Sequence, residues 1–150
     1  MARVTRSRTV EAPIGDVWSL VSDPYSLPRW WPRVSRVENV DAKAGGRRAR
    51  WTKVLATTEG RGVRADFRCV SSAERERYVW EQELEGTPFE RHLKALQVTV
   101  GLKERDGGTE VSLTEEQSLK GMSKLGSPLM RRARGDVLNE ALDGIERALG

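Results

Sequence analysis

The feature that most constrains the fold of this chain is a run of alternating segments between residues 63 and 119. In residues 63–71, apolar side chains fall on one face and charged ones on the other, which is typical of a half-buried strand. Residues 77–84, a long segment reaching Leu102, and the segment after Gly108 repeat this alternation. Only short connections separate them, so there is no room for the helical crossovers of a parallel sheet. The pattern predicts an antiparallel sheet.

Two short helices are expected after the first strand. That strand is predicted at residues 4–10, and Pro13 after it suits a first helical turn. Pro24 ends this helix, since the residue before a proline is disfavoured in the α conformation. A second short helical turn carries Trp30 and Trp31. We expect one of these tryptophans to point inward and the other to stay partly exposed.

Two more strands and a long C-terminal helix complete the pattern. The strands are predicted at residues 35–41 and 48–57. Residues 121–126 form a glycine-containing connection, after which Ser127 is a plausible N-cap and Pro128 a first helical residue. Seven antiparallel strands with helices at both ends of the chain indicate an α+β fold. The apolar face of the last helix, which needs a sheet to cover it, comprises Met130, Ala133, Val137, Leu138, Ala141, Leu142, Ile145 and Leu149.

Several short motifs occur in order along nearly the whole chain. They are Glu11-Ala12-Pro13, Asp16-Val17-Trp18, Asp23-Pro24, residues 27–32 (LPRWWP), Gly45-Gly46, the Trp80 strand, residues 85–91 (EGTPFER) and residues 107–111 (GGTEV). In their order and spacing the chain resembles the START-like superfamily, also called SRPBCC, in its polyketide cyclase/dehydrase branch. The resemblance implies a helix-grip fold, in which a seven-stranded sheet wraps a long C-terminal helix and leaves an apolar cavity between them. A single domain spanning residues 1–150 also agrees with the length.

The composition of the chain argues against a membrane-spanning segment, a disulfide and a zinc site. Hydrophobic residues make up 37% and charged residues 32% of the chain, and no apolar run approaches the roughly 20 residues that span a bilayer. The N-terminus lacks the apolar region of a secretory signal. We therefore expect a cytoplasmic protein with no integral membrane segment. Cys69 and His92 are the only residues of their kinds, too few for a disulfide or a Cys/His zinc site, and we predict no metal and no cofactor.

The net charge of +4 permits attraction to nucleic acid or anionic lipid. However, basic residues alternate with acidic ones on most segments, and no aromatic and basic platform for stacking bases is visible. Arg131, Arg132 and Arg134 begin the last helix, where the helix dipole disfavours cations. They make either a solvated face or a site for an anionic head group or acidic surface. We predict no nucleic-acid partner, and the oligomeric state stays open.

The inward faces of the strands and of the last helix supply a candidate cavity wall. Glu115 and Gln117 are the most informative, because alternation places both on the buried side of the seventh strand, where an unpaired carboxylate is costly. A buried acid needs a partner or a ligand, unless the strand reaches solvent at the cavity mouth. The apolar members could also simply form the core. The predicted cavity residues are Trp51, Phe67, Cys69, Tyr78, Trp80, Val98, Leu113, Glu115, Gln117, Met130, Ala133 and Val137.

The sixth strand carries further polar residues. Glu90, His92 and Lys94 are in phase with Val98, which would direct them toward the cavity opening, although a bulge would reverse that phase. His92 has no catalytic partner at any indicative spacing and is interpreted as a surface residue. Cys69 is interpreted as a small core residue.

These patterns favour the binding of a small hydrophobic or amphipathic molecule, such as a lipid, polyketide or aromatic compound. Tyr78, Gln117 or Glu115 would orient it. The alternative is an enzyme of the polyketide cyclase/dehydrase type that uses the same cavity, with an acid or base assisting proton transfer. No Ser/His/Asp constellation, nucleophile elbow or phosphate loop is present, so no catalytic residue is predicted. A second alternative, an adaptor for nucleic acid or a membrane surface, depends only on the basic charge.

Overall fold

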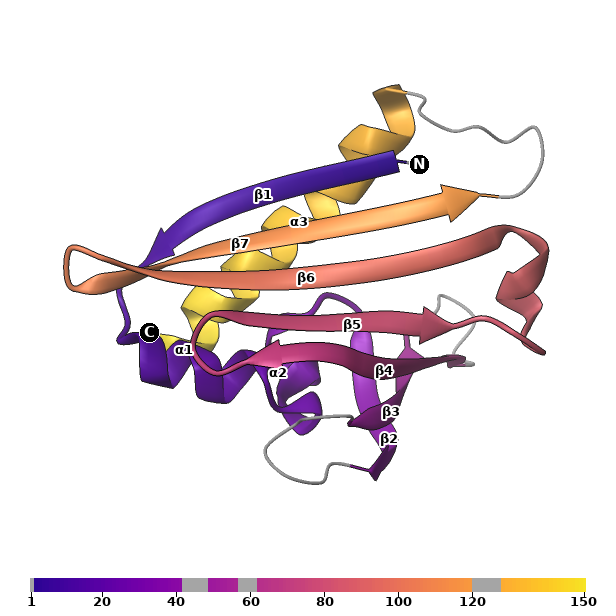
Figure 1. Cartoon of the computed structure of the whole chain (residues 1–150), viewed down its shortest axis with the longest axis horizontal. Helices are drawn as coiled ribbons and strands as arrows, with labels where there is room; N and C mark the ends of the chain where they lie inside the picture. The colour runs from indigo at the N-terminus through magenta and orange to yellow at the C-terminus, as the bar shows by residue number, and fades with distance from the viewer. Residues whose placement is uncertain (1, 42–48, 57–61, 120–127) are drawn as a thin grey trace.

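The computed structural model describes residues 2–41, 49–56, 62–119 and 128–150. Within them, seven strands form one antiparallel sheet in the order β1-β7-β6-β5-β4-β3-β2 (Figure 1). The helices are α1 (Ile14–Val21), η1 (Pro24–Ser26), α2 (Leu27–Trp30), η2 (Pro88–Arg91) and α3 (Pro128–Leu149). The strands are β1 (Ala2–Val10), β2 (Val34–Asp41), β3 (Arg50–Leu55), β4 (Val63–Ala73), β5 (Arg77–Glu83), β6 (Leu93–Arg105) and β7 (Gly108–Leu119). The predicted helix-grip architecture is confirmed.

Helix α3 crosses one face of the sheet, and α1 and α2 lie beside its C-terminal half (Figure 1). Leu138 and Leu142 are completely buried there. At the start of the helix, residues of the predicted apolar face are not buried, because the first turns of α3 extend beyond β1. Met130 is accordingly 40% exposed, and Ala133 is exposed as well. Pro128 begins the helix as predicted, whereas Ser127 and the connection at residues 121–126 lie outside the described residues.

Two expectations about the inner face are corrected. Trp30 and Trp31 are both buried, because Trp31 packs edge-on against Trp30 and Trp80 with ring centres 5.5 and 5.6 Å apart. The prediction that one of the pair stays partly exposed is therefore wrong. In β6, a register shift against β7 occurs between Leu93 and Ala95. This bulge reverses the alternation at the start of the strand.

The bulge changes which side chains of this segment face the interior. Glu90 and His92 belong to η2 and the turn after it, and both are exposed, as is Lys94. Leu93 instead contributes to the interior wall together with Leu96. The polar residues of the sixth strand thus do not point inward.

Gly144 allows α2 to approach α3 closely. A Cβ atom at this position would lie 2.7 Å from Trp30 Cα and 2.8 Å from Trp30 C, and still closer to Trp30 O. Alanine normally stabilises a helix interior by about 1 kcal/mol relative to glycine. Here we expect Gly144→Ala to lower the free energy of unfolding by about 1–2 kcal/mol, because the backbone of α2 must shift. Urea denaturation measures the change.

Gly135→Ala in the same helix is the matched control. A Cβ atom there meets only the guanidinium end of Arg6, which can rotate away. This variant should be as stable as the wild type or more stable. Equal effects of the two substitutions would contradict the close approach of α2 and α3.

Candidate functional site

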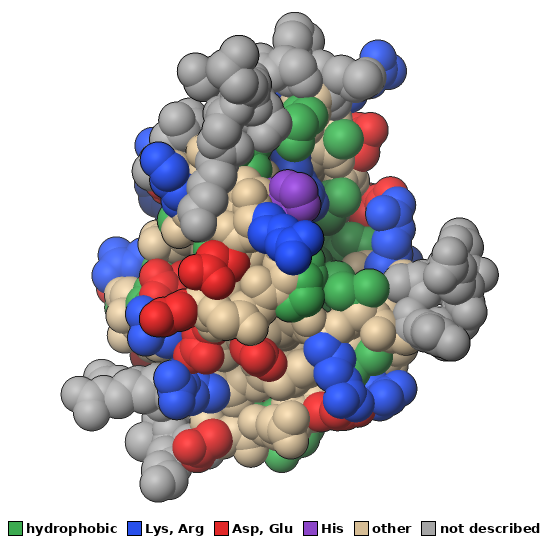
Figure 2. All heavy atoms as spheres, turned by 90° about the vertical axis from the view of Figure 1, so that its right-hand side faces the viewer, with side chains coloured by type: hydrophobic (Ala, Val, Ile, Leu, Met, Phe, Trp, Pro, Cys, Tyr) green, Lys and Arg blue, Asp and Glu red, His purple; other side chains and the backbone are tan. Residues whose placement is uncertain are grey.

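A cavity of about 310 Å³ lies between the inner face of the sheet and the first turns of α3. Strands β3 to β7 and η2 all contribute side chains to its wall. This end of the molecule faces the viewer in Figure 2, where hydrophobic side chains gather among basic and acidic ones. The apolar part of the wall consists of Trp31, Leu55, Ala65, Phe67, Phe89, Leu93, Leu96 and Val98. The polar part consists of Lys53, Gln82, Glu115, Gln117 and Arg134.

Glu115 is a buried carboxylate held by two neighbours. Its side chain is 4% exposed, and its Oε2 atom lies 2.8 Å from Arg134 Nε and accepts a 3.1 Å hydrogen bond from Gln117 Nε2. Burial raises the pKa of Glu115, while Arg134, Gln117 and Lys53 act in the opposite direction. The partner that this buried acid needs is therefore Arg134, at the start of α3. Arg131 and Arg132, beside it in the sequence, are exposed.

Lys53 is a buried cation that sequence reasoning missed. The residue is 3% exposed, and its Nζ atom lies 4.2 Å from the centre of the Phe67 ring, 4.6 Å from that of Trp31 and 5.1 Å from that of Trp80. Burial lowers its pKa to about 7; Glu115 opposes this shift and Arg134 adds to it. The signal was present in the sequence, because Lys53 stands two residues after the inward Trp51 on one strand.

The structure divides the predicted cavity residues into groups. Four of them line the cavity described above: Phe67, Val98, Glu115 and Gln117. Five others are buried in the core: Trp51, Cys69, Tyr78, Trp80 and Leu113.

The core group packs tightly against itself. The ring of Trp51 lies 6.5 Å from that of Tyr78 and 6.2 Å from that of Trp80. Burial also raises the pKa of Tyr78. The aromatic bulk fills this part of the space between sheet and helix.

The three predicted α3 residues lie apart from the cavity wall. Met130 borders a separate, very small space between β1, β7 and α3. Val137 packs against the margin of the core, and Ala133 is exposed. Successive helix residues point about 100° apart, so when Arg134 faces Glu115 its neighbour Ala133 faces another direction. Arg134, one residue further along, contributes to the wall in its place.

Gln82 links the cavity to a second hollow on the surface. This groove, of about 480 Å³, lies where β5 and β6 separate, and Gln82 and Leu96 border both spaces. The pairing of the two strands ends at Glu81 and Gln97. The side-chain Nε2 atom of Gln82 is buried and has no hydrogen-bond partner among the described residues.

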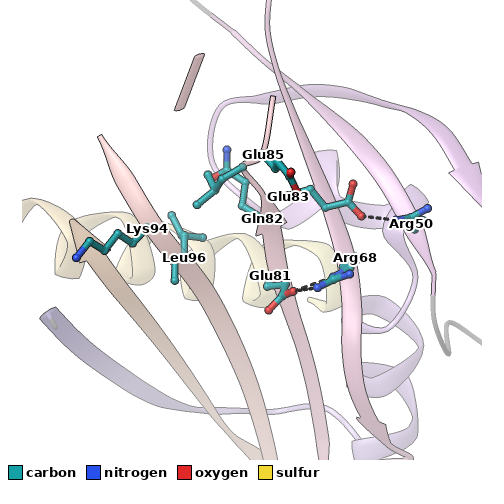
Figure 3. Close-up of a pocket in the computed structure, with 10 residues that line it drawn as sticks. Arg50, Arg68, Glu81, Gln82, Glu83, Glu85, Lys94 and Leu96 are labelled. Atoms are coloured by element: carbon teal, nitrogen blue, oxygen red, sulfur yellow. Dashed lines mark hydrogen bonds and ion pairs between the residues drawn. The ribbon is translucent and has the colours of Figure 1, made fainter. Parts of the chain in front are cut away.

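The groove is larger than the cavity but is built differently. Figure 3 shows Arg68 directed at Glu81 and Arg50 directed at Glu83 on one side, with Lys94 on the other. In each of these two ion pairs, the arginine and the glutamate already neutralise each other's charge. Ligand sites are mostly apolar with a few placed polar groups, and this description fits the cavity and not the groove. We therefore take the cavity as the candidate site.

No group of three or more His, Cys, Asp or Glu side chains is placed to hold a metal ion in the described residues. None of the helices within them is long and apolar enough to cross a membrane.

Comparison with known proteins supports the fold over the full length. A family model described as polyketide cyclase/dehydrase and lipid transport matches residues 1–150. No curated protein matches the chain. Among solved structures, a START superfamily protein from Mycobacterium smegmatis has a TM-score of 0.77 and 15% identity, with 98% of this chain and 96% of that chain covered.

Two further structures show the same likeness. A protein from Thermus thermophilus has a TM-score of 0.75 and 22% identity, with 99% and 97% of the two chains covered. The di-domain ARO/CYC StfQ from the steffimycin biosynthetic pathway has a TM-score of 0.77 and 11% identity. This chain covers 50% of StfQ, while 98% of this chain is matched.

Proposed function

Because this chain belongs to the polyketide cyclase/dehydrase and lipid transport family of the START-like superfamily, we propose that it binds a small hydrophobic or amphipathic molecule in the cavity between the sheet and α3. The observation that carries the proposal is the composition of the cavity wall. Eight apolar side chains surround a few buried polar groups on β3, β5 and β7 and the half-buried Arg134 on α3. Such a wall favours an apolar ligand by removing it from water and orients it through the polar groups.

The polar groups suited to orienting the ligand are on the wall itself. Glu115 and Gln117 line the cavity and would orient the ligand, together with Lys53 and Gln82 on the same wall. Tyr78, expected to share the role, lies in the core. The cavity is at the small end of the usual range for ligand sites, roughly 300–1,000 Å³. It suits a compact ligand.

Filling the cavity should abolish binding. Ala65 lines the wall, and we expect Ala65→Leu to weaken the binding of the neutral fluorescent probe N-phenylnaphthylamine at least about tenfold, because the added atoms occupy the ligand's space. Fluorescence titration measures the affinity. Circular dichroism melting curves show whether the variant is folded at the temperature of the titration.

The control adds the same atoms outside the cavity. Ala133→Leu changes an exposed position of α3 and should leave probe affinity unchanged. Wild-type affinity in a folded Ala65→Leu variant would contradict the proposed site.

A second candidate function is catalysis in the same cavity. A general acid or base works best with a pKa near the working pH, and Lys53, whose pKa is about 7, lies in the cavity wall. Conversion of a bound polyketone into a cyclised or dehydrated product by the wild type, and its loss in Lys53→Met, would favour the enzyme over the carrier.

A further inference from the structure

The cavity contains an ammonium group that no acidic side chain of the described residues pairs. Among the described residues, Lys53 forms no ion pair, and its ammonium group lies over the faces of aromatic rings. Glu115 is the carboxylate whose charge raises the pKa of Lys53. It already forms an ion pair with Arg134 and accepts a hydrogen bond from Gln117. Aromatic faces stabilise a cation only partly, and a buried charge is costly unless it is paired. Within the described part of the chain, one positive charge of the wall therefore lacks a counter-ion.

A second unsatisfied donor lines the same cavity. Gln82 is 9% exposed, and its Nε2 atom has no partner in the described part of the chain. The strand registers place Gln82 opposite Phe67 and Lys53 opposite Ala65, at positions two residues apart on the same face of β4. The ammonium of Lys53 lies over the ring of Phe67, the residue that the β4–β5 register pairs with Gln82. Buried donors without partners are rare in folded proteins.

A ligand that supplies hydrogen-bond acceptors and one negative charge would satisfy both donors. A carboxylate does both, since each of its two oxygens accepts hydrogen bonds and the group carries a full charge. The apolar part of the wall includes Phe67, Leu93 and Leu96. A neutral lipid or a hydrocarbon would leave both donors unsatisfied.

We propose that the ligand is a compact amphipathic carboxylate, with its carboxylate held by Lys53 and Gln82 and its apolar body against Phe67, Leu93 and Leu96. This inference rests on the proposed function and narrows the class of ligand. The cavity volume of about 310 Å³ favours a short acyl chain or a small fused ring system over a long lipid.

The charge of Lys53 should make this binding depend on pH. Burial lowers the pKa of the free side chain to about 7, opposed by Glu115 on β7 and reinforced by Arg134 on α3. A bound carboxylate favours the ammonium form, so above about pH 7 binding takes up a proton and the affinity falls as the pH rises. The other elements around the ammonium contribute uncharged rings, those of Trp31, Phe67 and Trp80.

The test compares two ligands with one apolar body. Naphthoate and naphthylmethanol differ in the carboxylate alone, and both are titrated against the full chain by displacement of N-phenylnaphthylamine. We expect the wild type to prefer naphthoate at least about tenfold at about pH 6, and to lose this preference between about pH 7 and pH 9. Calorimetry in two buffers of different ionisation enthalpy measures the proton taken up.

Three variants assign the preference to Lys53. Lys53→Met should bind both ligands equally. Lys53→Arg should keep the preference but lose its decline with pH, since arginine does not titrate in this range, and it also carries the test if the methionine variant fails to fold. Lys94→Met, which removes an exposed lysine on the outer groove, is the matched control and should behave like the wild type.

Each remaining outcome overturns a stated claim. If neither ligand nor the probe binds the wild type, the proposed function fails and this inference with it. Equal affinity for acid and alcohol, with the probe bound, overturns the carboxylate inference alone. A preference for the acid that persists in folded Lys53→Met also overturns it, because another cation would then hold the carboxylate.

Discussion

Lys53→Met is expected to stabilise the protein at neutral and acidic pH, although it removes a charged residue. A drop in the pKa from 10.5 to about 7 on folding corresponds to a penalty on the order of 5 kcal/mol when the pH is below both values. Methionine has a similar unbranched shape and no charge to desolvate. The Glu115 and Arg134 pair remains intact without the lysine. We expect a gain of a few kcal/mol in the free energy of unfolding.

The sign of the pH dependence distinguishes this explanation from a general packing effect. Between about pH 7 and pH 10.5 the unfolded state binds more protons at Lys53 than the folded state does, so the free energy of unfolding of the wild type rises with pH. The advantage of Lys53→Met should therefore be largest at and below about pH 7 and shrink toward about pH 10. Urea denaturation at several pH values measures both proteins, and effects of other groups cancel in the difference.

Lys103→Met is the matched control for this prediction. Lys103 is exposed on β6, so its charge stays in water in both states. The substitution should change stability by less than about 0.5 kcal/mol. An advantage of Lys53→Met that stays constant from neutral to alkaline pH would show that the ammonium is not buried as the structure has it.

If the penalty is confirmed, Lys53 destabilises the folded state, and stability does not explain why a lysine occupies this position. Groups of this kind, buried and strongly shifted in pKa, gather at functional sites. The result would support the role of Lys53 in binding without any knowledge of the ligand.

Leu142→Asp should prevent stable folding or lower the free energy of unfolding by at least about 3 kcal/mol. Leu142 is completely buried on the face of α3 that packs against the sheet and the short helices. An aspartate there either carries an unpaired charge or takes up a proton at the expense of stability, and it also leaves a cavity. Thermal and urea denaturation monitored by circular dichroism measure the loss.

The control for this variant is Glu140→Asp. It introduces the same residue two positions earlier, on the exposed side of α3, where a change within about 0.5 kcal/mol is expected. A melting curve of Leu142→Asp that matches the wild type would contradict the placement of α3 against the sheet.

Strand alternation and helical spacing, both local properties, were sufficient to predict the architecture. The β7 alternation placed Glu115 and Gln117 on the buried face, and the structure has them there. The clean pattern of β4 likewise placed Phe67 and Cys69 inward. These predictions succeed because the side-chain direction in a strand depends on sequence parity alone, unless a bulge intervenes. In β6 a bulge does intervene and reverses the predicted phase of Lys94, while Glu90 and His92 lie before the strand, in η2 and the turn after it.

Sequence parity could not separate the wall of a cavity from a filled core. Trp51 and Lys53 share one face of β3, yet the first packs among aromatic rings while the second lines the cavity. The difference depends on how much volume distant segments bring to each position, here Trp31 after α2 and Phe89 in η2.

The sequence by itself thus determined the elements of this protein, the strand faces and the presence of a buried carboxylate on the seventh strand. Only the tertiary structure decided that Arg134 is the partner of Glu115, that Lys53 contacts aromatic faces and has no counter-ion among the described residues, and that Trp31 is buried. The reason is physical. Local periodicity sets the direction of a side chain, but its charge partner and the space around it come from residues far away in the chain, which meet only when the sheet closes over the helix.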